Sequence, residues 1–175
     1  GYNPMAYRLF CLQSHYRRNL VFSWENLDNA VVAYEKLIAK IATLKKDGEV
    51  EENELAKMKE RFAGALKGDL NTSLAVTAVY DVLKAKCSDA TKLAALADFD
   101  TVLSLNLLSA AEKLAAKQAE EEAANADPEI DAMVAARTEA KKAKNWAEAD
   151  RIRDELKARG IEIIDTPQGA KWRKV

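Results

Sequence analysis

Apolar side chains recur every three or four positions between residues 27 and 44, and this stripe limits the possible folds more than any other feature. It consists of Leu27, Ala30, Val31, Tyr34, Leu37, Ile38, Ile41 and Leu44. That spacing gathers them on one face of an α-helix. Ser23 stands where an N-cap belongs, and Gly48 where a C-terminal stop belongs. Because a one-sided apolar helix has to bury that face, the stripe predicts several packed helices.

The sequence around this stripe also favours helices. Ala, Glu, Lys and Leu dominate the 175 residues, and six glycines and three prolines are few for an all-β sandwich or barrel. Further helices are expected at about residues 4–17, 52–66, 89–97 and 109–124, and one after Asn71 and Thr72. Successive helices with short connections predict a mainly α fold built on an antiparallel helical bundle.

Charge balance and local signals change near residue 127. Residues 1–127 hold 16 basic and 19 acidic side chains, whereas residues 128–175 hold 11 and 9. Asp127 and Pro128 are typical of a helix start with proline at its first position. The sequence then predicts two helices, a strand, a turn and a partner strand, at about residues 128–144, 146–159, 161–165, 166–169 and 171–175. We therefore predict a bundle domain, 1–127, and a small mixed α/β domain with a β-hairpin, 128–175.

Several classes of protein are disfavoured by what the sequence contains. Cys11 and Cys87 lie far apart and form neither a metal spacing nor a disulfide framework, so the cytoplasm is the expected location. No apolar run is long enough to cross a bilayer, and the first residues do not resemble a signal peptide. A net charge of -1 gives no overall basic signature. His15 is the single histidine, and a structural or surface role is favoured over catalysis.

Three arginines near the start of the chain are candidates for binding a phosphate backbone. Arg8, Arg17 and Arg18 lie on or just after the first predicted helix, in a segment without acidic residues. On one continuous helix Arg8 and Arg18 would share a face, with tyrosines nearby. The alternative is an ordinary solvated helix end. The residues alone leave both interpretations open.

A denser group of candidates lies in the predicted C-terminal domain. Lys141 is followed by Trp146, Asp150 and Arg153, of which the last two are three positions apart on one helix face. An aromatic ring can stack on an unpaired base, while arginine and carboxylate can read base edges. The alternative is a surface ion pair beside a core tryptophan, and it is favoured because Trp146 fits the apolar stripe. Trp172 poses the same choice, and a core position is favoured there too.

Three blocks of the sequence resemble class I cysteinyl-tRNA synthetases. The first resembles the segment after the KMSKS loop of that family, with Gly1, Tyr2 and Pro4, then His15, Tyr16 and Arg17, then Leu20, Phe22 and Ser23. The second block resembles the Asp-Asp-Leu-Asn-Thr helix start of the family, with Asp69, Leu70, Asn71, Thr72, Leu74 and Ala75. It also resembles the Phe-Asp-x-Val-Leu-Gly-Leu motif of the family, with Ser104 in place of the glycine. The third, from Arg137 to Arg173, resembles the terminal domain of the family almost position by position.

This resemblance implies a C-terminal fragment that lacks the catalytic domain. The HIGH-type histidine pair, the KMSKS lysine loop and the Cys/His zinc cluster of the family have no counterpart in this sequence. The resemblance implies that the parent uses ATP and cysteine to make cysteinyl-tRNA, with ATP and zinc bound by the missing catalytic domain and no cofactor in this fragment. The expected partners are tRNA-Cys and that catalytic domain, with no membrane and a monomeric state.

The resemblance also assigns roles to particular positions. It implies anticodon contact by Lys141, Trp146, Asp150, Arg153 and Asp165, and tRNA backbone contact through the bundle. Lys141 departs from the family, which often has arginine there, so the two-pronged fork that reads a base edge is lost. The resemblance moves Trp146 towards a stacking role.

Two other functions remain as alternatives. One is a structural bundle that docks on a catalytic domain or another protein without reading RNA. The other is a domain of a ligase that joins cysteine to a small amine, which the block from Arg137 to Arg173 argues against.

Overall fold

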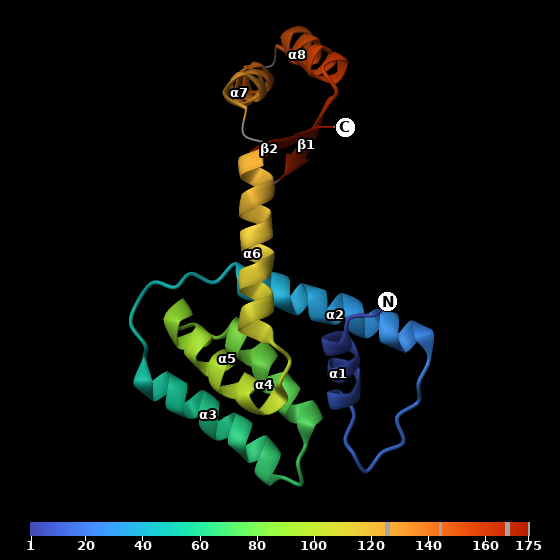
Figure 1. Cartoon of the computed structure of the whole chain (residues 1–175). Helices are drawn as coiled ribbons and strands as arrows, with labels where there is room; N and C mark the ends of the chain where they lie inside the picture. The colour runs from blue at the N-terminus through green and yellow to red at the C-terminus, as the bar shows by residue number, and fades with distance from the viewer. Residues whose placement is uncertain (125–126, 144, 167–168, 175) are drawn as a thin grey trace. The chain divides into compact units, whose positions relative to one another are not determined.

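The computed structural model describes residues 1–124, 127–143, 145–166 and 169–174, and in these it contains eight helices and one two-stranded sheet (Figure 1). The chain separates into two compact units, Gly1–Ala116 and Lys117–Val175, called unit 1 and unit 2 below. The division falls within one helix, α6 (Leu107–Ala124). The predicted boundary between residues 127 and 128 follows the end of that helix and stays a prediction.

Unit 1 is built from helices whose starts are set by side-chain caps. It contains α1 (Pro4–Leu12), α2 (Trp24–Ala42), α3 (Glu52–Lys67), α4 (Thr72–Lys84), α5 (Asp89–Leu103) and the first turns of α6. Ser23 accepts a hydrogen bond from the backbone N–H of Asn26, as predicted for the start of α2. Asn71 caps α4 in the same way through the N–H of Leu74. These caps satisfy backbone donors that a helix start leaves unpaired.

The core of unit 1 confirms the apolar stripe of α2. Six of its residues are buried: Leu27, Ala30, Tyr34, Leu37, Ile38 and Ile41. They pack with buried side chains from the other helices, among which Phe62 of α3 and Phe99 of α5 stack with ring centroids 4.1 Å apart. The Tyr34 hydroxyl, buried with them, donates to the carbonyl oxygen of Leu105 at 2.8 Å. The core therefore joins helices that are far apart in sequence.

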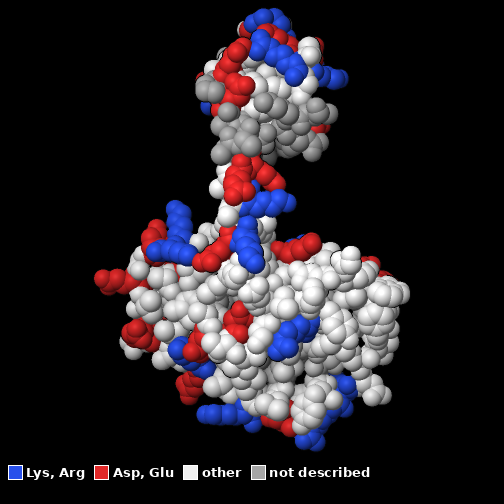
Figure 2. Space-filling view, in the orientation of Figure 1, with Lys and Arg blue, Asp and Glu red and all other residues white. Residues whose placement is uncertain are grey.

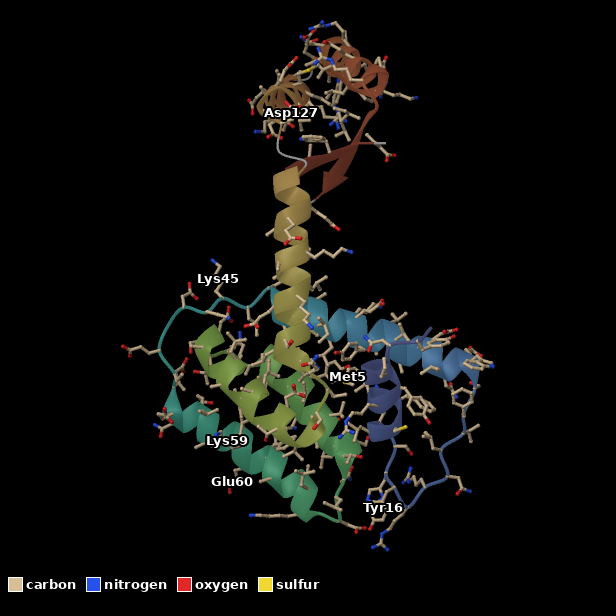
Figure 3. The ribbon with its side chains drawn as sticks, viewed as in Figure 1. Met5, Tyr16, Lys45, Lys59, Glu60 and Asp127 are labelled. Atoms are coloured by element: carbon tan, nitrogen blue, oxygen red, sulfur yellow. The ribbon has the colours of Figure 1, made fainter. Side chains whose placement is uncertain are left out.

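Three predicted helix ends are wrong, and tertiary contacts explain two of them. The helix expected at about residues 89–97 is α5, which continues to Leu103, where Ser104 adopts a left-handed conformation. The first helix ends at Leu12, before Arg17, because the chain turns there and is held by Asp69, as described below. The second ends at Ala42, before Gly48, and the connection that follows is bonded to the start of α5. In that connection the N–H of Lys45 donates to Asp89 at 3.1 Å (Figure 3). Gly48 has a φ of 93°, so the glycine serves a turn within this connection.

Unit 2 contains the last turns of α6, two further helices and a small antiparallel sheet. α7 (Pro128–Lys142) starts at Asp127, which accepts from the N–H of Glu129, and this confirms the predicted start (Figure 3). α8 (Trp146–Ala158) is followed by β1 (Ile161–Thr166) and β2 (Gly169–Lys174). The predicted turn at 166–169 includes residues 167–168, which lie outside the described residues. The buried side chains of this unit form a small core: Ile130, Val134, Ile152, Leu156 and Ile161.

The mainly α character predicted from the sequence is confirmed. Across the described ranges, none of the helices is both long enough and apolar enough to cross a membrane.

Candidate nucleic-acid interface

Trp146 is exposed, so the interpretation of this residue as a core anchor is wrong. It is the first residue of α8, directly after the capping residue Asn145, and 61% of its surface is accessible. Its spacing matches the buried Ala149, but a side chain at the very start of the helix lies beyond the part of α8 that packs on the core. The ring face is therefore available for stacking.

Asp150 and Arg153 lie together on the exposed surface of α8. The Arg153 Nη1 is 3.0 Å from the Asp150 Oδ1. The Asp150 side chain is 61% exposed and the Arg153 side chain 52% exposed. Arg153 also contacts Asp154 at 3.3 Å. In the protein without RNA these groups neutralise one another, and neither is buried, so both can exchange this partner for a base edge.

The remaining sequence-predicted contacts of unit 2 differ in their settings. Lys141 is half-buried in the last turn of α7. Asp165 lies in β1 opposite Ala170, and its side chain lies outside the described part of the chain. Trp172 packs against the small core, and its Nε1–H donates to Asp131 at 2.7 Å. That contact supports the interpretation of Trp172 as a core residue.

Several other charges on unit 2 are paired, and they are of mixed sign. Arg151 bonds to Glu148 at 2.6 Å, which lowers the pKa of the Glu148 carboxyl and raises that of the Arg151 guanidinium. Arg159 bonds to Glu129 at 2.6 Å, which raises the pKa of its guanidinium. Basic and acidic side chains are likewise interspersed over the face shown in Figure 2. We therefore expect RNA binding here to depend on particular side chains more than on a broad positive field.

In unit 1, the connection between α1 and α2 is fastened to the turn that precedes α4. The Tyr16 hydroxyl donates to Asp69 at 2.7 Å, and the Arg17 Nε lies 2.7 Å from the same carboxylate (Figure 3). His15 Nε2 is 3.8 Å from it. Asp69 and Leu70 have φ of 63° and 51°, a left-handed conformation that residues other than glycine rarely adopt. The His-Tyr-Arg and Asp-Leu-Asn-Thr blocks, distant in sequence, thus meet at one carboxylate.

The pKa values within this cluster follow from its hydrogen bonds. Donation by Tyr16, and then by Arg17, holds the pKa of the Asp69 carboxyl below its ordinary value. The same carboxylate raises the pKa of the Tyr16 hydroxyl, because it stabilises the protonated phenol. The Arg17 guanidinium has its pKa raised by Asp69 and Tyr16. All three groups are therefore held in the protonation states that maintain the cluster at neutral pH.

Beside this cluster lies a polar hollow of about 490 Å³. It is lined by Gln13, Ser14, His15, Arg17, Arg18, Asn71 and Ser73. Arg8, the third predicted backbone contact, is not among these residues, and its Nε–H donates to the carbonyl oxygen of Leu103 at 2.6 Å. Because α1 ends at Leu12, the expected shared helix face of Arg8 and Arg18 does not exist. The structure brings together Arg17 and Arg18 only.

Asp69 is the residue of this site that reasoning from the sequence missed. It lies in a block that resembles the family, but the resemblance gives it no role. The available signal was an acidic residue at a tight connection before a capping asparagine, but no sequence rule links it to a turn over fifty residues earlier.

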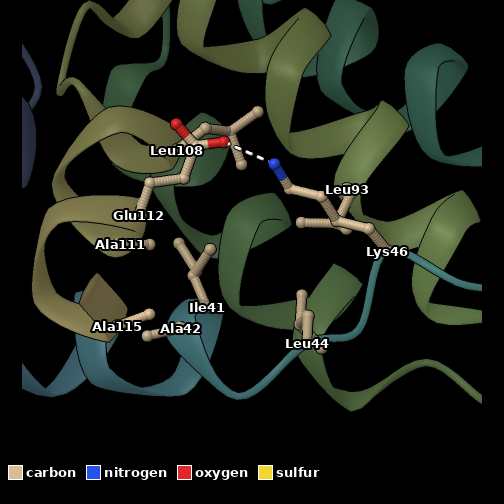
Figure 4. A pocket seen from close by; sticks show the side chains of 9 residues that line it. All are labelled: Ile41, Ala42, Leu44, Lys46, Leu93, Leu108, Ala111, Glu112 and Ala115. Atoms are coloured by element: carbon tan, nitrogen blue, oxygen red, sulfur yellow. Dashed lines mark hydrogen bonds and ion pairs between the residues drawn. The ribbon is translucent and has the colours of Figure 1, made fainter. Parts of the chain in front are cut away.

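A second hollow of unit 1, of about 400 Å³, is apolar (Figure 4). Ile41, Leu44 and Leu93 are among its lining residues, as are Lys46 and Glu112, which form an ion pair of 2.7 Å. An apolar lining does not suit a phosphate chain, so we do not include this hollow in the interface. Among the residues that the structure describes, no three or more His, Cys, Asp or Glu side chains are grouped to hold a metal ion.

Comparisons with known proteins agree with this geometry. Residues 123–173, which include the exposed Trp146 and the Asp150–Arg153 pair, match the family model of the cysteinyl-tRNA ligase anticodon binding domain. Over 99% of its length the chain is also similar to cysteine–tRNA ligases. Identity is 40% with that of Novosphingobium aromaticivorans, 38% with that of Methylococcus capsulatus and 36% with that of Symbiobacterium thermophilum.

These matches define first a class: a helical protein whose terminal portion is an anticodon binding domain. Along the rest of the chain the similarity is likewise to cysteine–tRNA ligases. The chain spans 36–39% of the length of these relatives. The resemblance predicted from the sequence is confirmed.

Proposed function

We propose that this chain is the tRNA-binding C-terminal region of a cysteine–tRNA ligase and that unit 2 reads the GCA anticodon of tRNA-Cys. The observation that carries the proposal is the exposed Trp146 at the start of α8, with the exposed Asp150–Arg153 pair on the same helix, inside the segment that matches the anticodon binding domain. A splayed anticodon base needs a surface to stack on and groups that pair with its edges.

The roles of the individual side chains follow from their chemistry. Trp146 offers a stacking face, Arg153 a donor fork suited to guanine, and Asp150 an acceptor for base amino groups. Lys141 contributes a point charge without the geometry of arginine. Asp165 joins this set through the resemblance alone. We assign Arg8, Arg17 and Arg18 to contacts with the tRNA backbone.

The proposal extends to the organisation of the whole enzyme. Residues 1–127 form an antiparallel bundle of the class I anticodon-binding type, and residues 128–175 form the anticodon-recognition domain with its β-hairpin. The parent ligase attaches cysteine to tRNA-Cys with ATP, in the cytoplasm, as a monomer. By the resemblance, zinc and ATP belong to the catalytic domain, which is a partner of this region.

Binding of tRNA-Cys transcripts with the GCA anticodon and with a changed anticodon tests the proposal. We expect modest affinity, with a log–log salt slope of about two to four counterions at about 0.7–0.9 each. Arg153→Ala should reduce the preference for GCA by about 1–3 kcal/mol. Arg151→Ala, a change of the same kind on the same helix, should leave that preference intact. Because Trp146 is exposed, Trp146→Ala should weaken binding while the thermal unfolding of unit 2 is unchanged.

Two results would contradict the proposal. If the Trp146 and Arg153 variants fold normally and keep the full anticodon preference, these side chains do not read the anticodon. If the unaltered chain binds no tRNA-Cys at low salt, the bundle serves to dock on a protein.

A further inference from the structure

The polar hollow of unit 1 has the composition of an anion site. Arg17 and Arg18 supply two positive charges to its lining, which also includes Asn71 and Ser73 from the cap and first turn of α4. The hollow has no acidic residue in its lining. A site with two guanidinium groups, polar neighbours and no carboxylate favours a phosphate group.

The two arginines are held differently. The Arg17 guanidinium is occupied on one side by Asp69, with the Nη2 at 3.1 Å and the Nε at 2.7 Å from its two oxygens, and the Arg17 Nε also lies 3.0 Å from the Tyr16 hydroxyl. Among the described residues, no side chain or backbone oxygen pairs with the guanidinium of Arg18; its backbone N–H donates to the carbonyl of His15 at 2.9 Å. Arg18 is thus attached to a fixed turn while its charge is uncompensated.

Aromatic side chains adjoin the hollow. Tyr16 is 61% exposed, stacks on His15 with centroids 4.9 Å apart, and carries the Arg17 guanidinium over its ring at 5.4 Å. Exposed aromatic faces beside cationic groups are typical of surfaces that bind RNA. This distinguishes the hollow from a simple carboxylate site for an acidic peptide.

We propose that this hollow binds a backbone phosphate of RNA, with Arg18 as the direct contact and Asp69 as a positioning residue that acts through Arg17 and Tyr16. The site lies in unit 1 and reads no base, so it adds affinity for any tRNA without anticodon preference. The inference rests on the proposed function, since it assumes that the chain binds tRNA. It assigns Arg18 a larger share than Arg17, whose charge is already compensated by Asp69.

The test compares Arg18→Gln with Lys36→Gln, which removes the same charge from an exposed position of α2 outside the hollow. Filter binding is measured with tRNA-Cys and with its anticodon variant over a series of salt concentrations. Arg18→Gln should weaken both RNAs by the same factor, about three- to tenfold, and should reduce the salt slope by about 0.7–0.9. Lys36→Gln should leave affinity and slope near those of the unaltered chain. Arg18→Lys should keep most of the slope because it retains the charge.

The outcomes separate this inference from the proposed function. If the unaltered chain binds tRNA-Cys and Arg18→Gln keeps full affinity and slope, the phosphate site is refuted and the function stands. If Arg18→Gln instead changes the anticodon preference, Arg18 is not a backbone contact and the inference fails. If no tRNA binds at low salt but an acidic peptide competes for the hollow, both proposals fail. Asp69→Asn should reproduce the loss of affinity and also lower the pKa of Tyr16, which is read from its ultraviolet titration.

Discussion

Unit 1 and unit 2 use aromatic residues in opposite ways. In unit 1, Phe62 and Phe99 stack inside an extensive core drawn from six helices. In unit 2, Trp146 stands in solvent while a small aliphatic core, closed by Trp172, holds the helices on the sheet. Unit 2 thus leaves exposed a large side chain that, if buried, would contribute most to its stability. The difference supports the proposal that α8 presents Trp146 to RNA.

The polar residues show a matching contrast. Unit 1 concentrates Tyr16, Arg17 and His15 on one carboxylate, Asp69, which fixes a turn. On α8, by contrast, the ion pairs are exposed and join residues of the same helix, as Asp150 and Arg153 do. Bonds between distant segments set the shape of a site, whereas pairs along one helix add little shape and exchange partners easily. We therefore expect backbone contacts in unit 1 to be preformed and base contacts in unit 2 to form with the RNA.

The largest effect should follow from opening the core of unit 1. Phe99 is fully buried and stacked on Phe62, so Phe99→Ala should lower the free energy of unfolding by about 3–5 kcal/mol. The control is Val102→Ala on the same helix, where the side chain is 52% exposed and the expected change is within about 0.5 kcal/mol. A urea titration that follows backbone amide signals of each unit measures the loss. If the signals of both units report the same loss in the free energy of unfolding, the two units unfold as one and the contrast between them is lost.

A smaller effect is expected in the core of unit 2. Leu156 is fully buried, and Leu156→Ala should cost about 2–3 kcal/mol, at the low end for leucine because few neighbours surround the space and they can close on it. Lys157→Ala, at the exposed neighbouring position, is the control. Because unit 2 has little core to lose, this change should unfold it at ordinary temperature and remove the anticodon preference, with residual binding through unit 1. Stability of unit 2 beyond that of unit 1 would contradict this account.

Features set by interactions within a few residues were predictable, whereas features set by distant contacts were not. The Ser23, Asn71 and Asp127 helix starts were predictable because each is set by a side chain and a backbone group within three residues. The stripe of α2 was predictable for the same reason, since helix periodicity is local. The ends of α1 and α2 were not, because bonds to Asp69 and Asp89 decide where each connection runs.

The candidate site divides in the same way. The spacing that puts Asp150 and Arg153 on one face of α8 is local and was predicted. The exposure of Trp146 depends on where the helix begins relative to the core, so periodicity alone assigned it to the interior. The anchoring of Arg17 by Asp69 joins segments more than fifty residues apart, and no pattern within either segment contains it.

The smallest effect tests whether the polar surface of α8 serves stability or binding. A double-mutant cycle of Asp150→Ala and Arg153→Ala should give a coupling of about 0.2–0.5 kcal/mol in the free protein, since pairs three positions apart on an exposed helix face contribute no more. The coupling should shrink as salt rises, because both side chains are more than half exposed. The Glu148–Arg151 pair of the same helix provides the matched cycle. Both cycles are measured by urea unfolding and by binding to the two anticodon variants.

Because Asp150 and Arg153 are weakly coupled to each other, each can turn to a base at little cost. Their removal should therefore affect anticodon preference far more than stability. A coupling above about 1 kcal/mol in the free protein would mean that the pair is structural, and the contrast between the two units would then not extend to their charges.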